Sequence, residues 1–216
     1  MIPNDQRNPT LTEIIEDVID VRTNDLHTSL PGKVLAFNAT NQTVDVQPSI
    51  KRYIEDKEVN IPVLKDVPLR FLKTGDFSIT APIKIDDEVL LIFCERAIDN
   101  WLTQGDIQTP DDRRKHDYSD AFAIPMMYND TIKITTYDDT NLQIRTSTGD
   151  GITIQPNGKI EIERDGDKLL QTISDALDAI SKSTIVIPSG SSAGTYPLAN
   201  AAVFTALKAI IDNLKI

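Results

Sequence analysis

The sequence has little of what enzymes most often use for catalysis and metal binding. Its 216 residues include one cysteine, two histidines and one tryptophan, and aromatic residues make up 6%. A single cysteine excludes an internal disulfide and every metal site built on paired thiolates. Because the two histidines stand far apart in the sequence, we expect no metal and no cofactor. With so few aromatics, the hydrophobic cores should consist mainly of Ile, Leu and Val.

Charge and hydropathy exclude further partners. With 33 acidic and 22 basic residues the formal net charge is −11, whereas a phosphate-binding surface needs clustered Lys and Arg. We therefore expect no nucleic-acid partner and no peripheral binding to anionic lipid. The N-terminal sequence lacks the apolar core of a signal peptide, and no apolar run is long enough to span a bilayer. The sequence predicts a soluble protein that is made in the cytoplasm.

Residues 1–29 are predicted to be an N-terminal helical segment. Thr10 and Glu13 have the spacing of a capping box, and the apolar residues that follow have helical spacing. Acidic residues occupy the other face. The helix either packs on its own domain or docks on a neighbouring protein, and both alternatives stay open. Its apolar docking face consists of Leu11, Ile14, Ile15, Val18 and Ile19.

Residues 30–128 are predicted to form a small β-barrel or sandwich. The hydrophobic period changes to two, and polar turns such as Asn38–Gln42 and Asp86–Asp87 separate the apolar segments. Prolines within "EVNIPVLKDVPLRFL" argue against a helix there. Five or six short strands with turn signals between them are typical of both architectures. The clearest strands are expected at 34–37, at 43–50, around Ile79 and at 88–93.

Residues 129–164 contain a repeated strand pattern. The segments "TIKIT", "NLQIR", "GITIQ" and "KIEIE" begin at positions 131, 141, 151 and 159, and each offers two apolar residues to one face. A ladder this thin buries too little apolar area to be stable alone. An oligomer whose chains share one interior supplies the missing cover. The predicted interior residues are Ile132, Ile134, Leu142, Ile144, Ile152, Ile154, Ile160 and Ile162.

Residues 165–216 are predicted to form helices on either side of a flexible linker at 187–197. Two sets of apolar residues are spaced by three and four, as in a coiled-coil seam, and helices this short need a partner. They either fold back as a helical hairpin within one chain or join a bundle of several chains. The bundle agrees better with a shared ladder. The predicted seam residues are Leu170, Ile173, Leu177, Ile180, Val203, Leu207, Ile210 and Leu214.

The window from Phe93 to Pro125 contains the cysteine, the tryptophan, one histidine and an Arg-Arg-Lys run, but no catalytic residue is predicted. Cys94 ends an apolar strand, where a buried structural thiol is more common than a nucleophile. Acidic residues flank Arg113–Lys115, which favours a loop of salt bridges over a nucleic-acid surface. Trp101 is expected to anchor this loop against the barrel. Nothing resembles a phosphate-binding glycine loop or a nucleophile elbow, so we expect no enzymatic activity.

The same window carries a family resemblance. "FCERAIDNWLTQG" followed by "DDRRKHDYSDAFAIP" resembles the N-terminal domain of the central spike proteins of contractile-tailed phages. The upstream "LPGKVLAFNATNQTVDVQPSI" and "FSITAPIKIDDEVLLIF" match the same pattern in order, so the resemblance covers residues 30–125. It implies a trimeric oligonucleotide/oligosaccharide-binding-type (OB-type) barrel at the tail hub. The family-motif residues are Cys94, Glu95, Arg96, Asp99, Asn100, Trp101, Arg113, Arg114, His116 and Asp117.

In such spikes, the resemblance implies, the barrel leads into an intertwined three-chain β-helix that is pushed through the host outer membrane. The C-terminal end of this chain departs from that pattern. Family members that pierce alone end in a narrow apex, where a His-x-His pair from each chain holds iron, but here no histidine follows His116. No metal is therefore carried over. The C-terminal helices are expected either to cap the trimer or to carry a separate tip protein.

These patterns predict a mainly β fold with an N-terminal helix, an OB-fold barrel, a short trimeric intertwined β-helix or β-prism, and C-terminal α-helices. The favoured function is a homotrimeric baseplate spike or hub of the virion, which transmits contraction force and helps to penetrate the host outer envelope. Its expected partners are other baseplate, hub or tail-tube proteins, a separate tip protein and, transiently, the host outer membrane. The alternative is a barrel that binds single-stranded nucleic acid or glycan, with an oligomerising tail. A Cys94-dependent hydrolase has the least support.

Overall fold

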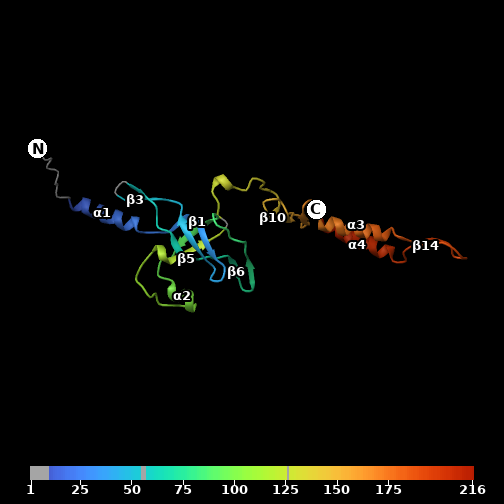
Figure 1. Ribbon diagram of the computed structural model, residues 1–216, viewed down its shortest axis with the longest axis horizontal. Coiled ribbons are helices and arrows are strands. Elements are labelled where there is room, and N and C mark those ends of the chain that lie inside the picture. The colour runs from blue at the N-terminus through green and yellow to red at the C-terminus, as the bar shows by residue number, and fades with distance from the viewer. Residues whose placement is uncertain (1–9, 55–56, 126) are drawn as a thin grey trace. The chain divides into compact units, whose positions relative to one another are not determined.

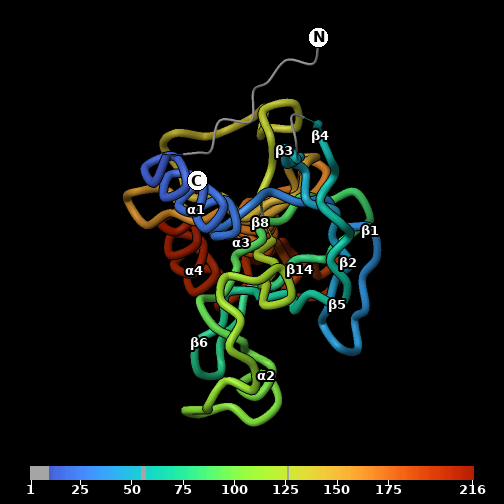
Figure 2. The backbone as a smooth tube through the Cα atoms, turned by 90° about the vertical axis from the view of Figure 1, so that its left-hand side faces the viewer, coloured from blue at the N-terminus to red at the C-terminus, as the bar shows by residue number. Residues whose placement is uncertain are grey.

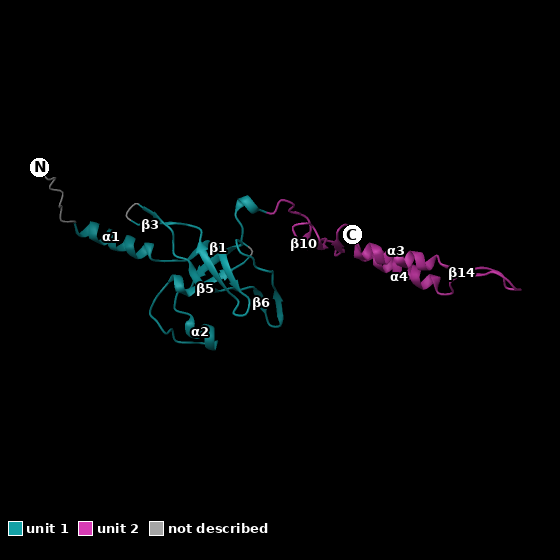
Figure 3. Ribbon diagram, in the orientation of Figure 1, with its two compact units in different colours: residues 1–133 teal, residues 134–216 magenta. Residues whose placement is uncertain are grey.

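The computed structural model describes residues 10–54, 57–125 and 127–216, which form two compact units (Figure 3). Unit 1 ends at Lys133 and unit 2 begins at Ile134. Unit 1 contains an N-terminal helix and a curled sheet, and unit 2 contains a smaller sheet and a helical hairpin (Figure 1). The described chain is mainly β, as the sequence predicts. Among the described residues, no helix has the length and apolar character needed to cross a membrane.

Helix α1 (Leu11–Asn24) begins at the predicted capping box. The Thr10 hydroxyl accepts a hydrogen bond from the Glu13 backbone N–H at 3.3 Å, and the Glu13 carboxylate accepts one from the Thr10 backbone N–H at 2.6 Å. Two of the free N–H groups at the helix start are thereby satisfied. These hydrogen bonds also hold the pKa of Glu13 below its ordinary value. Every residue of α1 is exposed, so the helix does not bury its apolar face against its own unit.

The main sheet of unit 1 has five antiparallel strands in the order β5-β2-β1-β8-β9. Its edges approach each other, because the Arg70 backbone N–H donates to the Ala123 carbonyl at 2.9 Å and Leu69 forms a bridge with Ala123. The sheet therefore curls into a half-barrel. This confirms the predicted hairpin and the strand at 88–93. The strands are β1 (Ser29–Asn38), β2 (Thr43–Pro48), β5 (Leu64–Pro68), β8 (Glu88–Phe93) and β9 (Ala121–Ile124).

The core of unit 1 lies inside this curled sheet and consists of small aliphatic residues with one aromatic. Strand β2 alternates strictly between half-buried and buried positions, as a period of two requires. Gly32 permits the close approach of β1 and β2, because a Cβ atom there would lie 2.4 Å from Val46 Cγ1. The buried core residues are Val34, Val44, Val46, Val67, Leu69, Val89, Leu91, Phe93, Ala121 and Ala123.

Smaller elements surround the sheet. The β3–β4 hairpin (Arg52–Ile54 and Lys57–Val59) and the β6–β7 hairpin (Leu72–Thr74 and Phe77–Ile79) are exposed two-stranded ribbons. The latter contains the strand predicted around Ile79. Helix α2 (Asp99–Gln104) lies in a loop that extends away from the sheet in both Figure 1 and Figure 2. A short 3₁₀ turn, η1 (Tyr118–Asp120), returns the chain to β9.

Unit 2 begins with a four-stranded antiparallel ladder in the order β10-β11-β12-β13. Three of the four predicted repeats are strands: β10 (Leu142–Arg145), β11 (Gly151–Ile154) and β12 (Ile160–Arg164). Each pairs with the next along the chain, and β13 (Asp167–Lys168) is a short addition.

The predicted strand "TIKIT" is wrong. Residues Asp130–Ile132 form a 3₁₀ turn, η2, and Ile134 belongs to no strand. The physical reason is Asn129, whose side chain accepts a hydrogen bond from the Thr131 backbone N–H at 2.8 Å and caps the turn. Ile132 and Ile134 therefore lie outside the ladder, and they do not contribute to its apolar face.

Unit 2 ends in a helical hairpin, in which α3 (Leu169–Ser181) and α4 (Ala201–Leu214) pack against each other. Of the two arrangements left open by the sequence, the folded-back hairpin is present. Strands include residue 187 and residues 194–197 of the predicted linker, and residues 188–193 connect them. A β-hairpin joins the helices, with β14 (Thr184–Ile187) paired to β15 (Gly194–Pro197). The β-branched run Ile185–Ile187 favours a strand, and Gly190 at a φ of 100° permits the turn.

Candidate functional site

Arg114 is the centre of an ion-pair network that holds the family-motif loop. Its Nε atom donates to Asp120 Oδ2 at 2.6 Å and its Nη2 atom donates to Asp120 Oδ1 at 3.0 Å, while Nη2 also contacts Asp99. Asp120 is fully buried and also accepts from the Ile98 backbone N–H at 3.1 Å. This bidentate pair raises the pKa of Arg114 above its ordinary value. The predicted loop of salt bridges is confirmed for Arg114.

Trp101 and Asn100 fix the same loop from α2. The Trp101 ring meets the Phe122 ring of β9 edge to face, with the ring centroids 6.0 Å apart. Asn100 donates from Nδ2 to the Thr109 carbonyl at 3.0 Å and closes the loop on itself. Trp101 therefore anchors the loop on the sheet as the sequence predicts.

The remaining motif residues lie at the surface or at turns. Asp117 accepts hydrogen bonds from the Ser119 backbone N–H at 2.9 Å and hydroxyl at 2.6 Å, and these lower the pKa of Asp117. Glu95 and Arg96 form an exposed ion pair at 2.8 Å, and Arg113 is exposed. These hydrogen bonds and ion pairs shape the loop.

Unit 1 contains the one thiol and both imidazoles of the chain. Burial, and then the nearby charge of Asp120, raise the pKa of the Cys94 thiol, which disfavours the thiolate. His116 lies close to the other histidine despite their separation in sequence, because its Nδ1 atom is 3.1 Å from the His27 carbonyl oxygen. Within the described residues, no cluster of three His, Cys, Asp or Glu side chains has a geometry that holds a metal ion.

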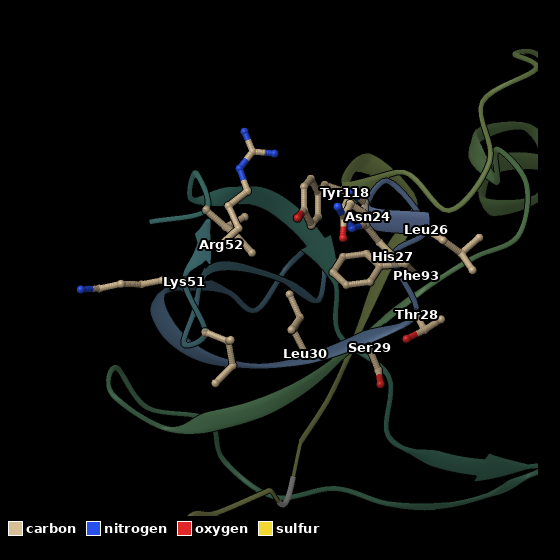
Figure 4. A pocket seen from close by; sticks show the side chains of 12 residues that line it. Asn24, Leu26, His27, Thr28, Ser29, Leu30, Lys51, Arg52, Phe93 and Tyr118 are labelled. Carbon is tan, nitrogen blue, oxygen red and sulfur yellow. The ribbon is translucent and has the colours of Figure 1, made fainter. Parts of the chain in front are cut away.

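A pocket of about 230 Å³ lies where the α1–β1 segment meets the half-barrel (Figure 4). The His27 ring stacks on Tyr118 with the centroids 3.7 Å apart, and Phe93 meets Tyr118 edge to face. Arg52 lies near these rings, while the Lys51 side chain points away from them. Burial lowers the pKa of His27, so its imidazole is mostly neutral at pH 7. The pocket therefore offers aromatic faces beside the Arg52 cation.

The ladder of unit 2 leaves its apolar face open. Cross-strand pairing aligns Leu142, Ile154 and Ile160 in one row and Ile144, Ile152 and Ile162 in a second row on the same face. Apart from the half-buried Ile154, these side chains remain between 37% and 62% exposed. The opposite face is polar, yet it holds Glu161, which is buried and accepts from Lys168 Nζ at 2.6 Å. The polar side is covered and the apolar side is not.

The helical hairpin also exposes many of its apolar side chains. Of the predicted seam on α3, Leu170 and Leu177 are half-buried, whereas Ile173 and Ile180 are exposed. The seam on α3 therefore spans two faces of the helix. All four predicted seam residues of α4 lie on its exposed side: Val203, Leu207, Ile210 and Leu214.

Unit 2 consequently has no hydrophobic core of its own. All of its residues are described, and the only two that are buried are polar, Glu161 and Ser174. Sequence reasoning did not single out these two residues or Asp120. Ser174 lies between the predicted seam residues Ile173 and Leu177. A polar residue at that position was the one sign in the sequence that the helix contact is polar. Exposed apolar side chains in such number form a surface that can pack against another molecule.

The comparisons with known proteins relate part of unit 1 to a phage protein domain. Residues 30–126 match the family model described as "Phage protein Gp138 N-terminal domain". The match spans the curled sheet from β1 to β9, and includes neither α1 nor unit 2. It indicates a phage structural protein and is consistent with a component of the virion. A search of curated proteins finds no match to this chain.

Proposed function

We propose that this chain is a subunit of the homotrimeric central spike or hub of a contractile-tail baseplate. Three findings support the proposal: the match to a phage protein domain, the curled five-stranded sheet that an OB-type barrel requires, and the missing core of unit 2. The last of these carries most weight. The missing core is a property of the chain's own packing, and other copies of unit 2 would bury the exposed apolar side chains.

In this proposal the open face of the ladder becomes the interior of the assembly. Three ladders, each with two rows of apolar residues, would surround a common axis and bury those rows against one another. The interior consists of Leu142, Ile144, Ile152, Ile154, Ile160 and Ile162, without Ile132 and Ile134. Strands wrapped around one axis form a stiff rod, which suits the transmission of force from a contracting sheath to the host outer envelope. The chain itself performs no catalysis.

The exposed ends of the chain are assigned to partners in the same proposal. On α1 the apolar residues are 44% to 73% exposed along the predicted docking face, and acidic residues occupy the remaining surface. This helix would bind another baseplate, hub or tail-tube protein. At the other end, the β14–β15 hairpin exposes Ile185, Val186 and Tyr196 within a segment that has no charged residue from Ser183 to Leu207. A separate tip protein would bind there, and either protein would meet the host outer membrane only transiently.

The location of the protein in the virion tests this proposal. Virions should contain the protein, and an antibody against it should label the end of the tail that is distal to the head, on both extended and contracted tails. An antibody against a capsid protein serves as the control for accessible surfaces. Labelling of the head, or absence of the protein from purified virions, would show that the assignment is wrong.

A second candidate function rests on the pocket of unit 1. Stacked rings of His27 and Tyr118 beside Arg52 are the kind of surface on which a base or a sugar ring stacks. Binding of single-stranded nucleic acid would appear as a gel shift that weakens with salt, and binding of glycan as a signal on a glycan array. Loss of that binding in Tyr118→Ala, with the protein still folded, would favour the binding module over the spike.

A further inference from the structure

The contact between α3 and α4 is unusual because its centre is polar. Ser174 is fully buried and donates to Asp212 Oδ1 at 2.7 Å. Lys208 and Lys215 each place Nζ 2.6 Å from the Asp212 carboxylate. These four residues lie between the helices, where most helical hairpins place aliphatic side chains. The network satisfies these polar groups, and the apolar residues on the inner sides of the helices, Leu170, Leu177, Phe204 and Ile211, are only half-buried.

A second set of apolar residues lies on stripes that face away from the partner helix. On α3 the stripe is spaced by four, three and four residues, and α4 has a stripe with the same spacing. The large side chains of both stripes are between 36% and 57% exposed. The stripe residues are Leu169, Ile173, Ala176 and Ile180 on α3, and Val203, Leu207, Ile210 and Leu214 on α4.

Helical geometry puts both stripes on the same side of the hairpin. At 3.6 residues per turn, each stripe is rotated by roughly 100–120° from the face that contacts the other helix. The rotation has the same sense about each helix axis. The helices are antiparallel, since Ser174 in the first half of α3 contacts Asp212 near the end of α4. The two stripes therefore form one apolar face, which we call the outward face.

The chemistry of the outward face fits a second copy of the chain better than other occupants. It contains no charged residue, and α3 and α4 carry the same spacing, so that stripes of different copies are complementary to each other. It also belongs to the unit whose ladder is open on its apolar side. Lys215 joins the two regions through a bridge with Ile160 of β12.

We propose that the outward face binds the outward faces of the other copies, so that the C-terminal hairpins form a bundle of helices that closes the assembly. This inference rests on the proposed oligomer and adds a second interface to it. The polar network between α3 and α4 fixes the register of each hairpin, and the two outward stripes pack between chains. Two buried apolar interfaces, one in the ladder and one in the helix bundle, then hold the copies of unit 2 together.

Crosslinking of single cysteines in the full-length chain tests the second interface separately from the first. In a Cys94→Ser background, Leu207→Cys places a thiol on the outward face and Ile144→Cys places one on the ladder. Ala209→Cys is the matched control, because Ala209 is on the same helix and is exposed on the side away from both the stripe and α3. Each variant is treated with a short bis-maleimide under native conditions and analysed on a denaturing gel.

We expect Leu207→Cys and Ile144→Cys to give covalently linked chains, at least tenfold more than Ala209→Cys gives. Linked chains with Ile144→Cys but none with Leu207→Cys would overturn this inference and leave the proposed oligomer intact. No linked chains with either variant would overturn both. Should Leu207→Cys lose its helical circular dichroism, Val203→Cys on the same stripe repeats the test. A monomer whose outward face binds neutral lipid vesicles, or only other virion proteins, would also contradict the inference.

Discussion

The substitution Ile144→Asp separates a shared ladder interior from an exposed strand. In the single chain, Ile144 is 62% exposed. On a free surface, a polar substitution changes the unfolding free energy by about 0.5 kcal/mol or less. Complete burial of an Ile side chain stabilises by about 1.5–3 kcal/mol. In a trimer interior the exposed part of Ile144 is buried as well, which contributes about 1–2 kcal/mol of this per chain. An unpaired buried carboxylate costs about 3–5 kcal/mol more.

The two costs together reach about 4–7 kcal/mol per chain, or more than 12 kcal/mol for a trimer. Because each 1.4 kcal/mol is a factor of ten, the association constant should fall by at least eight orders of magnitude. Sedimentation velocity should show that Ile144→Asp is monomeric at micromolar concentration. The control Gln143→Glu changes the adjacent residue on the other face and keeps the oxygen that accepts from Arg145 Nε. It should remain assembled. An Ile144→Asp protein that assembles as the unmodified chain does would refute the shared interior.

Three further predictions concern unit 1. Arg114→Ala leaves the buried Asp120 carboxylate without its cation and should destabilise the half-barrel by about 3–5 kcal/mol. Urea unfolding followed through Trp101 fluorescence measures this loss. An effect below about 1 kcal/mol would mean that Asp120 is not paired in solution. Because the pKa of Cys94 is raised, its thiolate fraction at pH 7 is low. The native protein should therefore react with a bulky disulfide reagent far more slowly than the urea-unfolded protein. Equal rates would contradict the placement of the thiol. Gly32→Ala should lower the unfolding free energy by about 1–3 kcal/mol, since its Cβ would overlap Val46, and a neutral result would show that β1 and β2 are less closely packed.

The parts of the fold that the sequence predicts correctly are those in which the local pattern and the burial agree. The β1–β2 hairpin alternates apolar and polar residues around a polar turn, and its inward valines are buried. The Thr10–Glu13 capping box forms because both partners lie within one turn of the helix. In these cases no distant residue competes with the local preference.

The errors occur where a single side chain or a tertiary contact overrides the pattern. Ile132 and Ile134 alternate as a strand does, but Asn129 caps a turn at that position. The α3 seam was assigned to one face from its spacing alone, whereas the polar contact through Ser174 turns Leu170 and Leu177 toward α4. Asp120 was overlooked because nothing in the sequence shows that Arg114, in a loop, reaches a buried carboxylate.

The missing core of unit 2 makes the mass of the protein in solution the most direct test of the whole account. Size-exclusion chromatography with light scattering should give a mass of three times 24.0 kDa, and this mass should persist on dilution. A stable monomer of 24.0 kDa with a folded unit 2 would contradict the account, because the open ladder and the outward face would then need no cover from other copies.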